Sequence, residues 1–341
     1  MPPGARPVKG FSLWRVLIGL AVVLVLIGLA TYVPIPIFYA YTPGPVRDIE
    51  SLVDVSEART YSSEGTLFLT TVNVDPQVTL WEMVAIGFDP DRVVVMRDQV
   101  TRGQSLEQLI ELQRAEMQGS KQHATEAALA ALGFGAPEGR GVRVIDTAPG
   151  FDARSVLERD DLIVAIGGEE VDTTCDVGRL VDRHEVGDRV EVVVKRNGER
   201  RTFRIETRAS REEPGRPLLG VEKMEDVGYS FEPGVEVDFK TGKIGGPSAG
   251  LMMTLALYDK LTPDDLTGGR RIAGTGTIEC GGRVGPIGAI EQKVAGAERE
   301  GAAIFLSPQA NVDAAKRAAD DIEVVAISNF DDAREYLENL E

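Results

Sequence analysis

The longest apolar run of the chain lies near its N-terminus. No charged residue occurs from Val16 to Val46, and Val, Leu and Ile dominate the 18 positions from Val16 to Val33. As a helix, these positions would span roughly 27 Å, which is close to the thickness of a bilayer's hydrocarbon core. Pro34 and Pro36 follow directly, and proline ends a helix because it removes a backbone donor. We therefore predict one transmembrane helix within residues 1–36.

The charges beside this run predict its orientation. Arg6, Lys9 and Arg15 precede most of the apolar residues, and basic residues mark the cytoplasmic side of a membrane helix. We expect a single-pass protein of the cell membrane, with its N-terminus in the cytoplasm and the remainder outside. The alternative is a cleaved signal peptide, with Ala40 as the candidate cleavage position. The run is longer than the apolar region of a signal peptide, which favours a retained anchor.

Residues 37–118 combine strand and helix patterns, and they predict a mixed α/β region next to the membrane. The run Gly65–Val74 carries apolar side chains on both faces, as in a strand packed on two sides. Arg92–Met96 predicts a second strand, and Ser105–Met117 predicts an amphipathic helix. No candidate catalytic or ligand-binding residue stands out in this region.

Residues 119–212 alternate short apolar runs with turn signals, which predicts a β-rich domain. A helix at Gln122–Leu132 leads into this domain. Strands are expected within Gly141–Ile145, Asp160–Gly168 and Val190–Val194, with turns at Ala148–Gly150 and Asn197–Gly198. An Asn-Gly pair is typical of a two-residue hairpin turn.

Residues 213–341 contain a glycine-rich turn, Gly245-Gly246-Pro247-Ser248, followed by an apolar helical pattern. The first amides of a helix have no partner within the helix, so they can stabilise an oxyanion that forms on a serine at that position. Ser248 is therefore a candidate nucleophile, and the two glycines allow a substrate backbone to approach. The alternative is a serine that only caps the helix. A phosphate loop is not expected, because the chain lacks the pattern G-x-x-x-x-G-K-[ST].

The second candidate residue is Lys293, in a helix predicted from about Ala289 to Glu300. It falls three positions after Ile290 and four before Ala297, so it lies on or beside the apolar stripe. Burial lowers the pKa of a lysine, and a neutral amine can take the proton of a serine. The alternative is a lysine that extends along the apolar surface to reach water.

Composition and charge limit the classes of partner that this chain is expected to bind. Apolar residues make up 43% of the chain, and 37 basic against 54 acidic residues give a net charge of −17. This balance argues against a nucleic-acid partner, whose phosphates require basic surface. The two cysteines, Cys175 and Cys280, indicate neither a metal site nor a disulfide framework, and we expect two small buried side chains. His123 and His184 are expected to be ordinary polar residues, which leaves a Ser-His-Asp triad without its base.

Residues 119–212 resemble a bacterial PDZ domain. The Ala-Pro-Gly turn, the stretch DDLIVAIGGEEV and the hairpin VGDRVEVVVKRNGE carry this resemblance. It implies a loop whose backbone amides hold the terminal carboxylate of a peptide, which then adds to a sheet edge. Leu132, Gly133 and Phe134 fit that loop, although Ala131 stands where the best-known version has glycine. The alternative is that Leu132 and Phe134 are core residues after a helix that ends at Gly133.

The third region resembles the peptidase domain of Lon proteases. The segments GGPSAGL, GTGTIECGGRVGPIGAIEQKVAGAEREGA and IFLSPQAN carry the resemblance, in this order, over about Val235 to Asn311. The resemblance implies an α/β (α+β) fold with Ser248 as nucleophile and Lys293 as base. It also implies that Thr275 orients the lysine. Gly245 stands where many Lon proteins have an acidic residue, so the electrostatics of the substrate pocket should differ.

The whole layout resembles the PDZ-containing Lon-like peptidases of bacterial envelopes. It implies an ATP-independent serine endopeptidase outside the cytoplasm that cleaves envelope or secreted proteins and recognises their C-terminal tails. Gly245 and Gly246 would support the oxyanion site, and no metal or cofactor is expected. Lon-type domains commonly form hexameric rings, so self-association is expected. The alternative function is a membrane-tethered PDZ scaffold with a latent peptidase domain.

Overall fold

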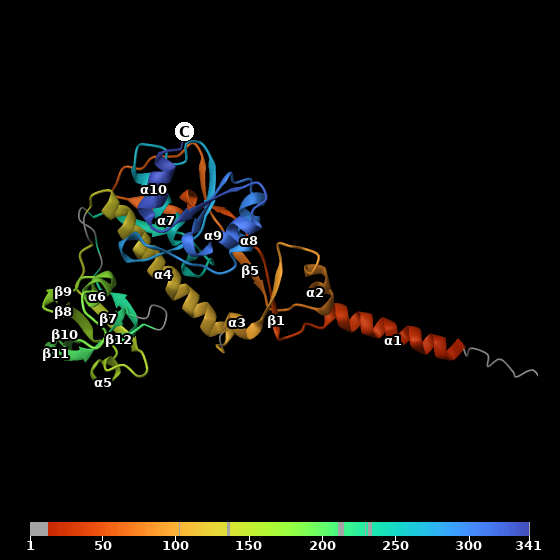
Figure 1. Cartoon of the computed structure of the whole chain (residues 1–341), viewed down its shortest axis with the longest axis horizontal. Helices are drawn as coiled ribbons and strands as arrows, with labels where there is room; N and C mark the ends of the chain where they lie inside the picture. Colours follow the sequence, from red (N-terminus) through yellow and green to blue (C-terminus); the bar gives the residue numbers. More distant parts are fainter. Residues whose placement is uncertain are drawn as a thin grey trace, which may run out of the picture.

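The structure is a computed structural model that describes residues 13–101, 103–134, 137–210, 215–228, 230 and 234–340. Figure 1 shows a projecting N-terminal helix, a small sheet at its base, one long helix and two larger bodies. The projecting helix is α1, Leu13–Tyr32. Among the described residues it is the one helix that is long and apolar enough to cross a membrane. Arg6 and Lys9, the predicted basic flank, lie outside the described residues.

A small antiparallel sheet follows α1, with the strand order β5-β1-β6. Its strands are β1 (Phe38–Pro43), β5 (Val72–Asp75) and β6 (Val93–Met96). Two short helices accompany it, α2 (Leu80–Ile86) and α3 (Arg97–Thr101). The predicted strand Gly65–Val74 is divided, because the chain leaves one sheet after Leu69 and enters this one at Val72.

The long helix α4, Leu106–Ala131, runs beside both larger bodies (Figure 1). The sequence analysis expected two helices, at Ser105–Met117 and Gln122–Leu132, but the structure joins them. Ser105 and Gln108 form a capping box at its start. At its end Gly133 takes a φ of 83°, as is common after a helix C-terminus.

The first larger body contains a sheet with the order β11-β10-β8-β7-β14. Its strands are β7 (Val142–Thr147), β8 (Leu162–Ile166), β10 (Arg189–Arg196), β11 (Glu199–Glu206) and β14 (Val221–Asp226). Shorter elements are β9 (Glu169–Glu170), β12 (Arg208–Ala209), β13 (Pro217–Leu218), α5 (Ala153–Val156) and α6 (Thr174–Val181). The predicted Asn197-Gly198 hairpin turn joins β10 to β11, with positive φ at both residues, and this prediction is confirmed.

The second larger body contains a sheet with the order β2-β4-β16-β19-β20. Its strands are β2 (Arg47–Asp48), β4 (Thr66–Leu69), β16 (Arg271–Gly274), β19 (Ile304–Pro308) and β20 (Glu323–Ile327). The helices are α7 (Gly250–Leu261), α8 (Ile290–Arg299), α9 (Val312–Ala318) and α10 (Phe330–Glu338). The pairs β3 (Val53–Ser56) with β15 (Glu236–Phe239) and β17 (Thr277–Ile278) with β18 (Val284–Gly285) lie outside this sheet.

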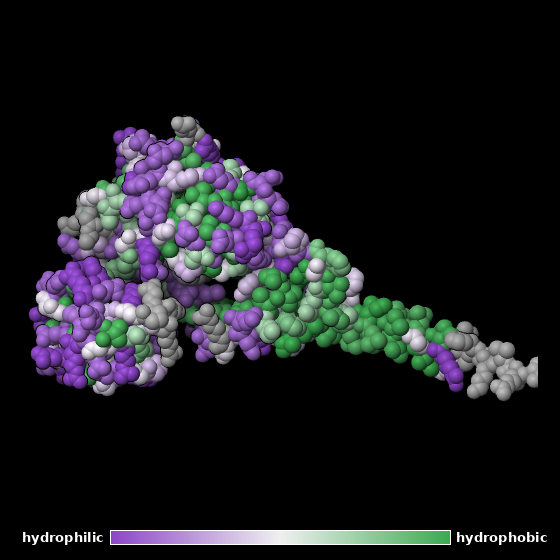
Figure 2. All heavy atoms as spheres, viewed as in Figure 1, coloured by the Kyte–Doolittle hydropathy of each residue, from purple (hydrophilic) through white to green (hydrophobic). Residues whose placement is uncertain are grey.

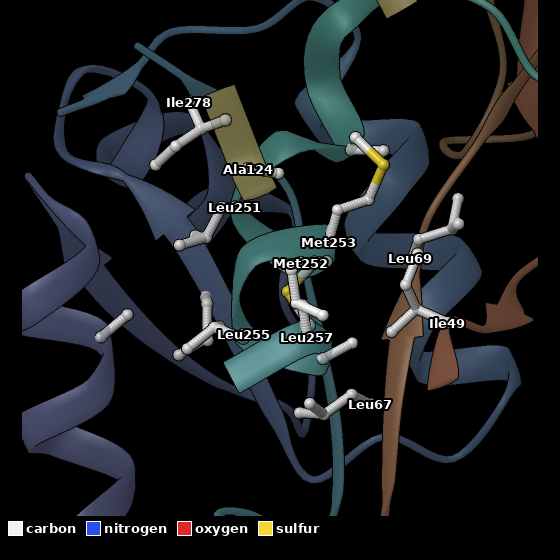
Figure 3. Close-up of a cluster of buried hydrophobic side chains, with 14 of the residues drawn as sticks. Ile49, Leu67, Leu69, Ala124, Leu251, Met252, Met253, Leu255, Leu257 and Ile278 are labelled. Carbon is white, nitrogen blue, oxygen red and sulfur yellow. The ribbon is translucent and has the colours of Figure 1, made fainter. Parts of the chain in front are cut away.

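Four one-turn 3-10 helices complete the second body, which are η1 (Glu50–Leu52), η2 (Pro247–Ala249), η3 (Cys280–Gly282) and η4 (Gln309–Asn311). The body includes β4, which the sequence analysis assigned to the separate region 37–118. Strand β4 lies parallel to β16, with Leu67 opposite Ile272. Figure 3 shows Leu67 and Leu69 packed against the buried face of α7. Apolar residues on both faces of β4 require this central place in a core.

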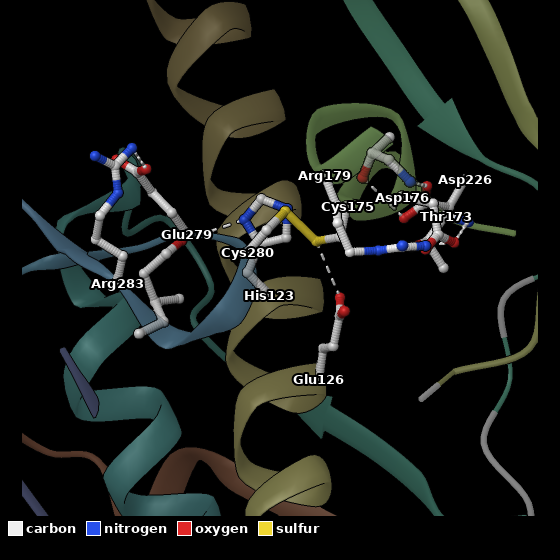
Figure 4. Close-up of a disulfide and its surroundings, with 12 residues drawn as sticks. His123, Glu126, Thr173, Cys175, Asp176, Arg179, Asp226, Glu279, Cys280 and Arg283 are labelled. Carbon is white, nitrogen blue, oxygen red and sulfur yellow. Dashed lines mark hydrogen bonds and ion pairs between the residues drawn. A yellow bond between two sulfur atoms is a disulfide. The ribbon is translucent and has the colours of Figure 1, made fainter. Parts of the chain in front are cut away.

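A disulfide joins the two larger bodies, and it corrects the expectation for the cysteines. Cys175, in α6, is bonded to Cys280, in η3, and the two are 105 residues apart (Figure 4). His123 of α4 lies beside them, with its Nε2 3.8 Å from Cys280 Sγ. Sequence spacing did not suggest the bond, because the pairing depends on how two separately folded bodies meet.

Candidate active site

Ser248 lies in the one-turn helix η2 that leads directly into α7. The chain enters this turn through Gly246, whose φ of 82° is costly for residues with a Cβ. Helix α4 holds the turn from behind, since Ser120 Oγ donates to the carbonyl of Pro247 at 3.0 Å. The predicted turn and helix are therefore confirmed, and Ser248 faces a cleft at the start of the helix.

Lys293 reaches Ser248 from α8. Its Nζ lies 2.8 Å from Ser248 Oγ, 3.0 Å from Thr275 Oγ1 and 3.2 Å from the carbonyl oxygen of Thr70. Only 4% of the lysine is exposed. Of the two readings of Lys293, the structure supports the buried amine and excludes a side chain that extends to water.

The polar neighbours of Lys293 Nζ determine which hydrogen bonds the amine can make. The carbonyl of Thr70 can only accept a hydrogen bond. Thr275 Oγ1 donates its own hydrogen to the carbonyl of Ser248 at 2.9 Å, so it accepts from Lys293. A neutral amine has two hydrogens and one lone pair. If both hydrogens bind these acceptors, the lone pair is left for the Oγ–H of Ser248, which is the arrangement that proton abstraction requires.

Burial shifts the pKa of Lys293. Desolvation of the charged form lowers it from 10.5 to about 7. Among the described residues, no carboxylate makes an ion pair with Lys293 that would oppose this shift. A substantial fraction of the amine is therefore neutral near pH 7, in hydrogen-bond contact with a serine hydroxyl.

The oxyanion support expected from Gly245 and Gly246 is only partly available. The amide of Gly246 donates to the carbonyl of Gln113 in α4 at 2.9 Å, so this group is already occupied. Gly245 lies against the same glutamine, because a Cβ built on Gly245 would come within 3.2 Å of Gln113 Cβ. The amides of Ser248 and Ala249, in the first turn of the helical segment, remain the better candidates.

A cavity of about 970 Å³ opens at Ser248. Its lining includes the turn before the serine, the start of α8, and strand β5 of the small sheet. Besides Lys293, this lining contains three basic side chains, Arg47, Lys240 and Lys243, and one acidic side chain, Glu116. The cavity thus carries more basic than acidic groups on a chain whose net charge is −17.

Thr70 is the part of this site that the sequence analysis missed. It follows β4 directly, and its side chain donates to the carbonyl of Gly274 at 3.2 Å while its own carbonyl accepts from Lys293. A carbonyl has no residue-type signal, so only the pairing of β4 with β16 could have revealed it. Thr275, by contrast, was predicted, and it lies at the end of β16.

The structure does not bring Leu132, Gly133 and Phe134 to a free sheet edge. Leu132 and Phe134 pack in an apolar cluster with Leu129, Val235 and Leu261. Residues of the second body supply two of these partners, so the segment closes the end of α4 onto that body. This placement favours the alternative of core residues after a helix that ends at Gly133.

Among the described residues, the first body has a sheet edge at β14 with no strand paired on its outer side. Strand β14 is the last strand of its sheet, and α6 packs beside it. The loop before it contains Leu218-Leu219-Gly220, and Gly220 has a φ of 82°. The carbonyl of Gly220 accepts from the amide of Ala148 at 2.8 Å. The sequence LLGV has the aliphatic-glycine pattern expected of the peptide-binding loop. It lies at the end of the domain, and the sequence analysis did not assign it.

The histidines take no part in the Ser248 site. His123 Nδ1 lies 3.2 Å from the carbonyl of Ile278, and His184 lies 3.9 Å from Asp188. His123, Cys175 and Cys280 are the one group of His, Cys or acidic residues in the described ranges that could surround a metal ion. Both sulfur atoms of that group are joined in the disulfide.

Two segments of the chain match known protein families. Residues 234–338 match the family described as the Lon protease (S16) C-terminal proteolytic domain. Residues 95–207 match the PDZ domain family. The second match begins before the predicted boundary at residue 119, and it includes the whole of α4.

Curated relatives match about a third of the chain or less. Lon protease 2 of Bacillus subtilis (strain 168) is 32% identical over 107 residues, which are 31% of this chain and 17% of that protein. Lon protease of Frankia alni is 39% identical over 94 residues, which are 27% of this chain and 10% of that protein. The chain therefore spans less than a fifth of the length of these relatives.

Solved structures match about a quarter of the chain. The PDZ domain of an SdrC-like protein from Listeria monocytogenes is 25% identical, with a TM-score of 0.23, over 24% of this chain and 86% of that one. A solution structure from Geobacillus thermodenitrificans is 29% identical, with a TM-score of 0.23, over 24% of this chain and 94% of that one.

Proposed function

Because the chain carries a Lon-type proteolytic domain and a PDZ domain, we propose that it is a serine endopeptidase with a Ser248–Lys293 dyad, anchored in a membrane by α1. The observation that carries the proposal is the contact of 2.8 Å between Ser248 Oγ and a lysine amine that is almost completely buried. A lysine kept away from water and from carboxylates has the lowered pKa that a general base needs at neutral pH.

In the proposed reaction, Lys293 takes the hydroxyl proton of Ser248 as Oγ attacks the peptide carbonyl. The tetrahedral oxyanion accepts hydrogen bonds from amides of the first helical turn, near Ser248 and Ala249. The lysine then gives its proton to the leaving amine, and an acyl-enzyme forms. Water attacks this ester, again with Lys293 as base, and the second product leaves. Thr275 and the carbonyl of Thr70 hold the amine in place throughout.

The reaction consumes only water, so cleavage of an exposed segment requires no nucleotide. We therefore propose an ATP-independent peptidase that acts on envelope or secreted proteins outside the cytoplasm. The orientation follows from Arg6 and Lys9, which precede α1, and from Arg15 in its first turn. The Cys175–Cys280 disulfide supports an extracytoplasmic location, because disulfides persist in oxidising compartments. Self-association into rings, as the Lon resemblance implies, stays part of this proposal.

We place substrate recognition at β14, in place of the Gly133 segment. A C-terminal peptide could add to the free edge of β14, with its carboxylate at the Leu218–Gly220 loop. If the peptide runs antiparallel to β14, the residues before its C-terminus lie along this strand and leave it beside Asp226. Asp226 accepts hydrogen bonds from Thr174 at the start of α6, next to the cysteine bonded to the proteolytic domain. A bound tail would thus extend toward the body that contains Ser248.

Covalent labelling tests the dyad directly. A serine-reactive fluorophosphonate probe, followed by mass spectrometry, should place the adduct on Ser248 of the wild type. Lys293→Ala should lose labelling, and Lys316→Ala, an exposed lysine of α9 remote from the cleft, should label like the wild type. Equal labelling of the Lys293→Ala variant, or an adduct on another serine only, would refute the dyad. That result would favour the alternative of a membrane-tethered PDZ scaffold with a latent peptidase domain.

A further inference from the structure

The small sheet at the base of α1 presents large apolar side chains to solvent. We call this surface the apolar shoulder, and define it as Ile37, Leu80, Trp81, Val84, Phe88 and Met96. Phe88 is 87% exposed and Trp81 is 64% exposed. Side chains of this size are usually buried in a soluble domain, and a contiguous exposed group of them marks an interaction surface.

The shoulder has a consistent direction. At 100° per residue, Leu80, Trp81, Val84 and Phe88 fall within an arc of about 100° around the axis of α2, if its helical spacing is continued to Phe88. The polar side chain of Glu82 bonds within the protein, because it completes the capping box of α2 with Thr79. The apolar residues therefore point away from the protein as one stripe, without a described partner segment over them.

The shoulder is also continuous with the candidate membrane helix. Pro34 bridges to Thr79, and the amide of Ile35 donates to the carbonyl of Val78 at 2.8 Å, so α2 begins where α1 ends. In Figure 2 the apolar surface of α1 continues onto α2 and the adjoining part of the small sheet. Tyr32, at the end of α1, is 82% exposed at this junction. Trp and Tyr are enriched at the boundary between lipid tails and water.

From these contacts we infer that the apolar shoulder lies in the headgroup region of the outer leaflet and that the Ser248 cleft is held against the bilayer. Strand β1 connects the two. Phe38 pairs with Met96 of the shoulder, and Tyr41, three residues on, lines the cleft. At about 3.4 Å per residue, that separation is roughly 10 Å along the strand. The substrate class is then polypeptide that lies at the membrane surface, such as the segment that follows a membrane helix. This inference rests on the proposed anchoring by α1.

The chain contains two tryptophans, Trp14 and Trp81, which allow the anchor and the shoulder to be tested separately. Trp14→Phe leaves Trp81 as the reporter of the shoulder, and Trp81→Phe leaves Trp14 as the reporter of α1. Each full-length variant is reconstituted into vesicles of dioleoyl phosphatidylglycerol and phosphatidylcholine brominated on its acyl chains. The expected result is bromine quenching of both tryptophans, with Trp81 shielded from acrylamide in the water.

Three results would overturn the inference. If Trp14 is quenched by bromine while Trp81 responds only to acrylamide, the anchor inserts but the shoulder stands clear of the bilayer. If Trp81 is shielded from both quenchers, a second copy of the chain covers the shoulder instead of lipid. If neither tryptophan is quenched by bromine, the anchoring itself fails, and the inference fails with it.

An activity measurement adds a functional readout. Phe88→Gln combined with Trp81→Gln should lower kcat/KM for a peptide tethered to these vesicles by about tenfold, because the cleft is no longer held at the surface. The same peptide free in solution should be cleaved at an unchanged rate. Val186→Gln, at an exposed apolar residue of the first body, serves as the matched control and should change neither rate. Equal loss on both peptides would contradict the inference.

Discussion

The turns at Gly246 and Gly133 were each assigned a function from the sequence, but the structure gives them different surroundings. The turn at Gly246 places Ser248 within hydrogen-bond distance of Lys293, with polar groups from β4 and β16 around the amine. Among the described residues, the side chains on either side of Gly133 pack in an apolar cluster, and the turn closes the end of a helix. A glycine turn supplies a backbone shape. Whether it forms a site depends on the side chains that distant segments bring to it.

The largest effect is expected when Lys293, the polar partner of the Gly246 turn, is replaced. Lys293→Met should reduce peptide cleavage by about 10³-fold or more, since the base of the reaction is lost. The same change should increase the free energy of unfolding at pH 7 by roughly 2–4 kcal/mol, because the cost of burying an amine disappears. Cleavage assays and urea unfolding measure the two effects.

The stability gain should depend on pH. The folded pKa of Lys293 is about 7 and its ordinary value is 10.5, so the unfolded chain binds a proton that the folded chain releases between these values. Wild-type stability therefore rises from pH 7 to 10.5, and the advantage of Lys293→Met should vanish near the upper end. Lys316→Met, at an exposed position, should show no such trend. A variant that is less stable at pH 7 would contradict the cost of burial.

Activity should fall steeply with acid. Below a pKa of about 7, the neutral fraction of Lys293 decreases tenfold with each pH unit. Cleavage of an uncharged peptide should therefore be about 100-fold slower at pH 5 than on its alkaline plateau. A profile of kcat/KM from pH 5 to 9 measures this, with circular dichroism as the control for folding. A flat profile would show that the amine is not the titrating base.

A smaller effect is expected when Thr275, which bonds to the amine, is replaced. Thr275→Val removes the acceptor for Lys293 and the donor to the carbonyl of Ser248. We expect kcat to fall about 10- to 100-fold, which corresponds to a rise of about 1.5–3 kcal/mol in the activation free energy. Thr277→Val, two residues away and without a described bond to the amine, should cost much less. Because Thr275 positions the base, its loss should also shift the apparent pKa in the pH profile. An unchanged profile would reduce Thr275 to a structural role.

The smallest effects are expected at the Gly133 turn. Gly133→Ala should destabilise the protein by about 1–2 kcal/mol, since its φ is 83°, and leave the affinity for C-terminal peptides within twofold. Gly220→Ala should weaken that affinity about tenfold, because the added Cβ would collide with the ring of Phe151 and displace the loop. Peptide titrations by calorimetry compare the two. Loss of affinity in Gly133→Ala, without loss in Gly220→Ala, would show that the Gly133 segment is the binding loop.

Several elements could be read from the sequence because they depend on local pattern. The helix predicted at about Ala289–Glu300 forms as Ile290–Arg299, and the turn before Ser248 begins its helix as expected. The apolar run at the N-terminus forms one helix. Apolar spacing, proline and glycine are properties of neighbouring residues, so an isolated sequence is sufficient to locate them.

Other features depend on contacts between distant segments. The Cys175–Cys280 disulfide requires two bodies to meet, and neither cysteine has a sequence neighbour that predicts it. The amide of Gly246 is withdrawn from the oxyanion site by Gln113, a residue of another helix. Strand β4 belongs to the sheet of the proteolytic body although it precedes that body by about 170 residues, because its two apolar faces need cover on both sides.

Local sequence pattern was sufficient to identify the residue types of the candidate site, a serine at a helix start and a lysine on an apolar helix stripe, together with their ordered motifs. The tertiary structure decided that the two atoms lie 2.8 Å apart and that Thr70 and Thr275 direct the hydrogens of the amine. It also decided which sheet edge is free and which apolar surface is left uncovered beside α1. Periodicity reports which face of an element is apolar, whereas only the packing of all elements determines what that face meets.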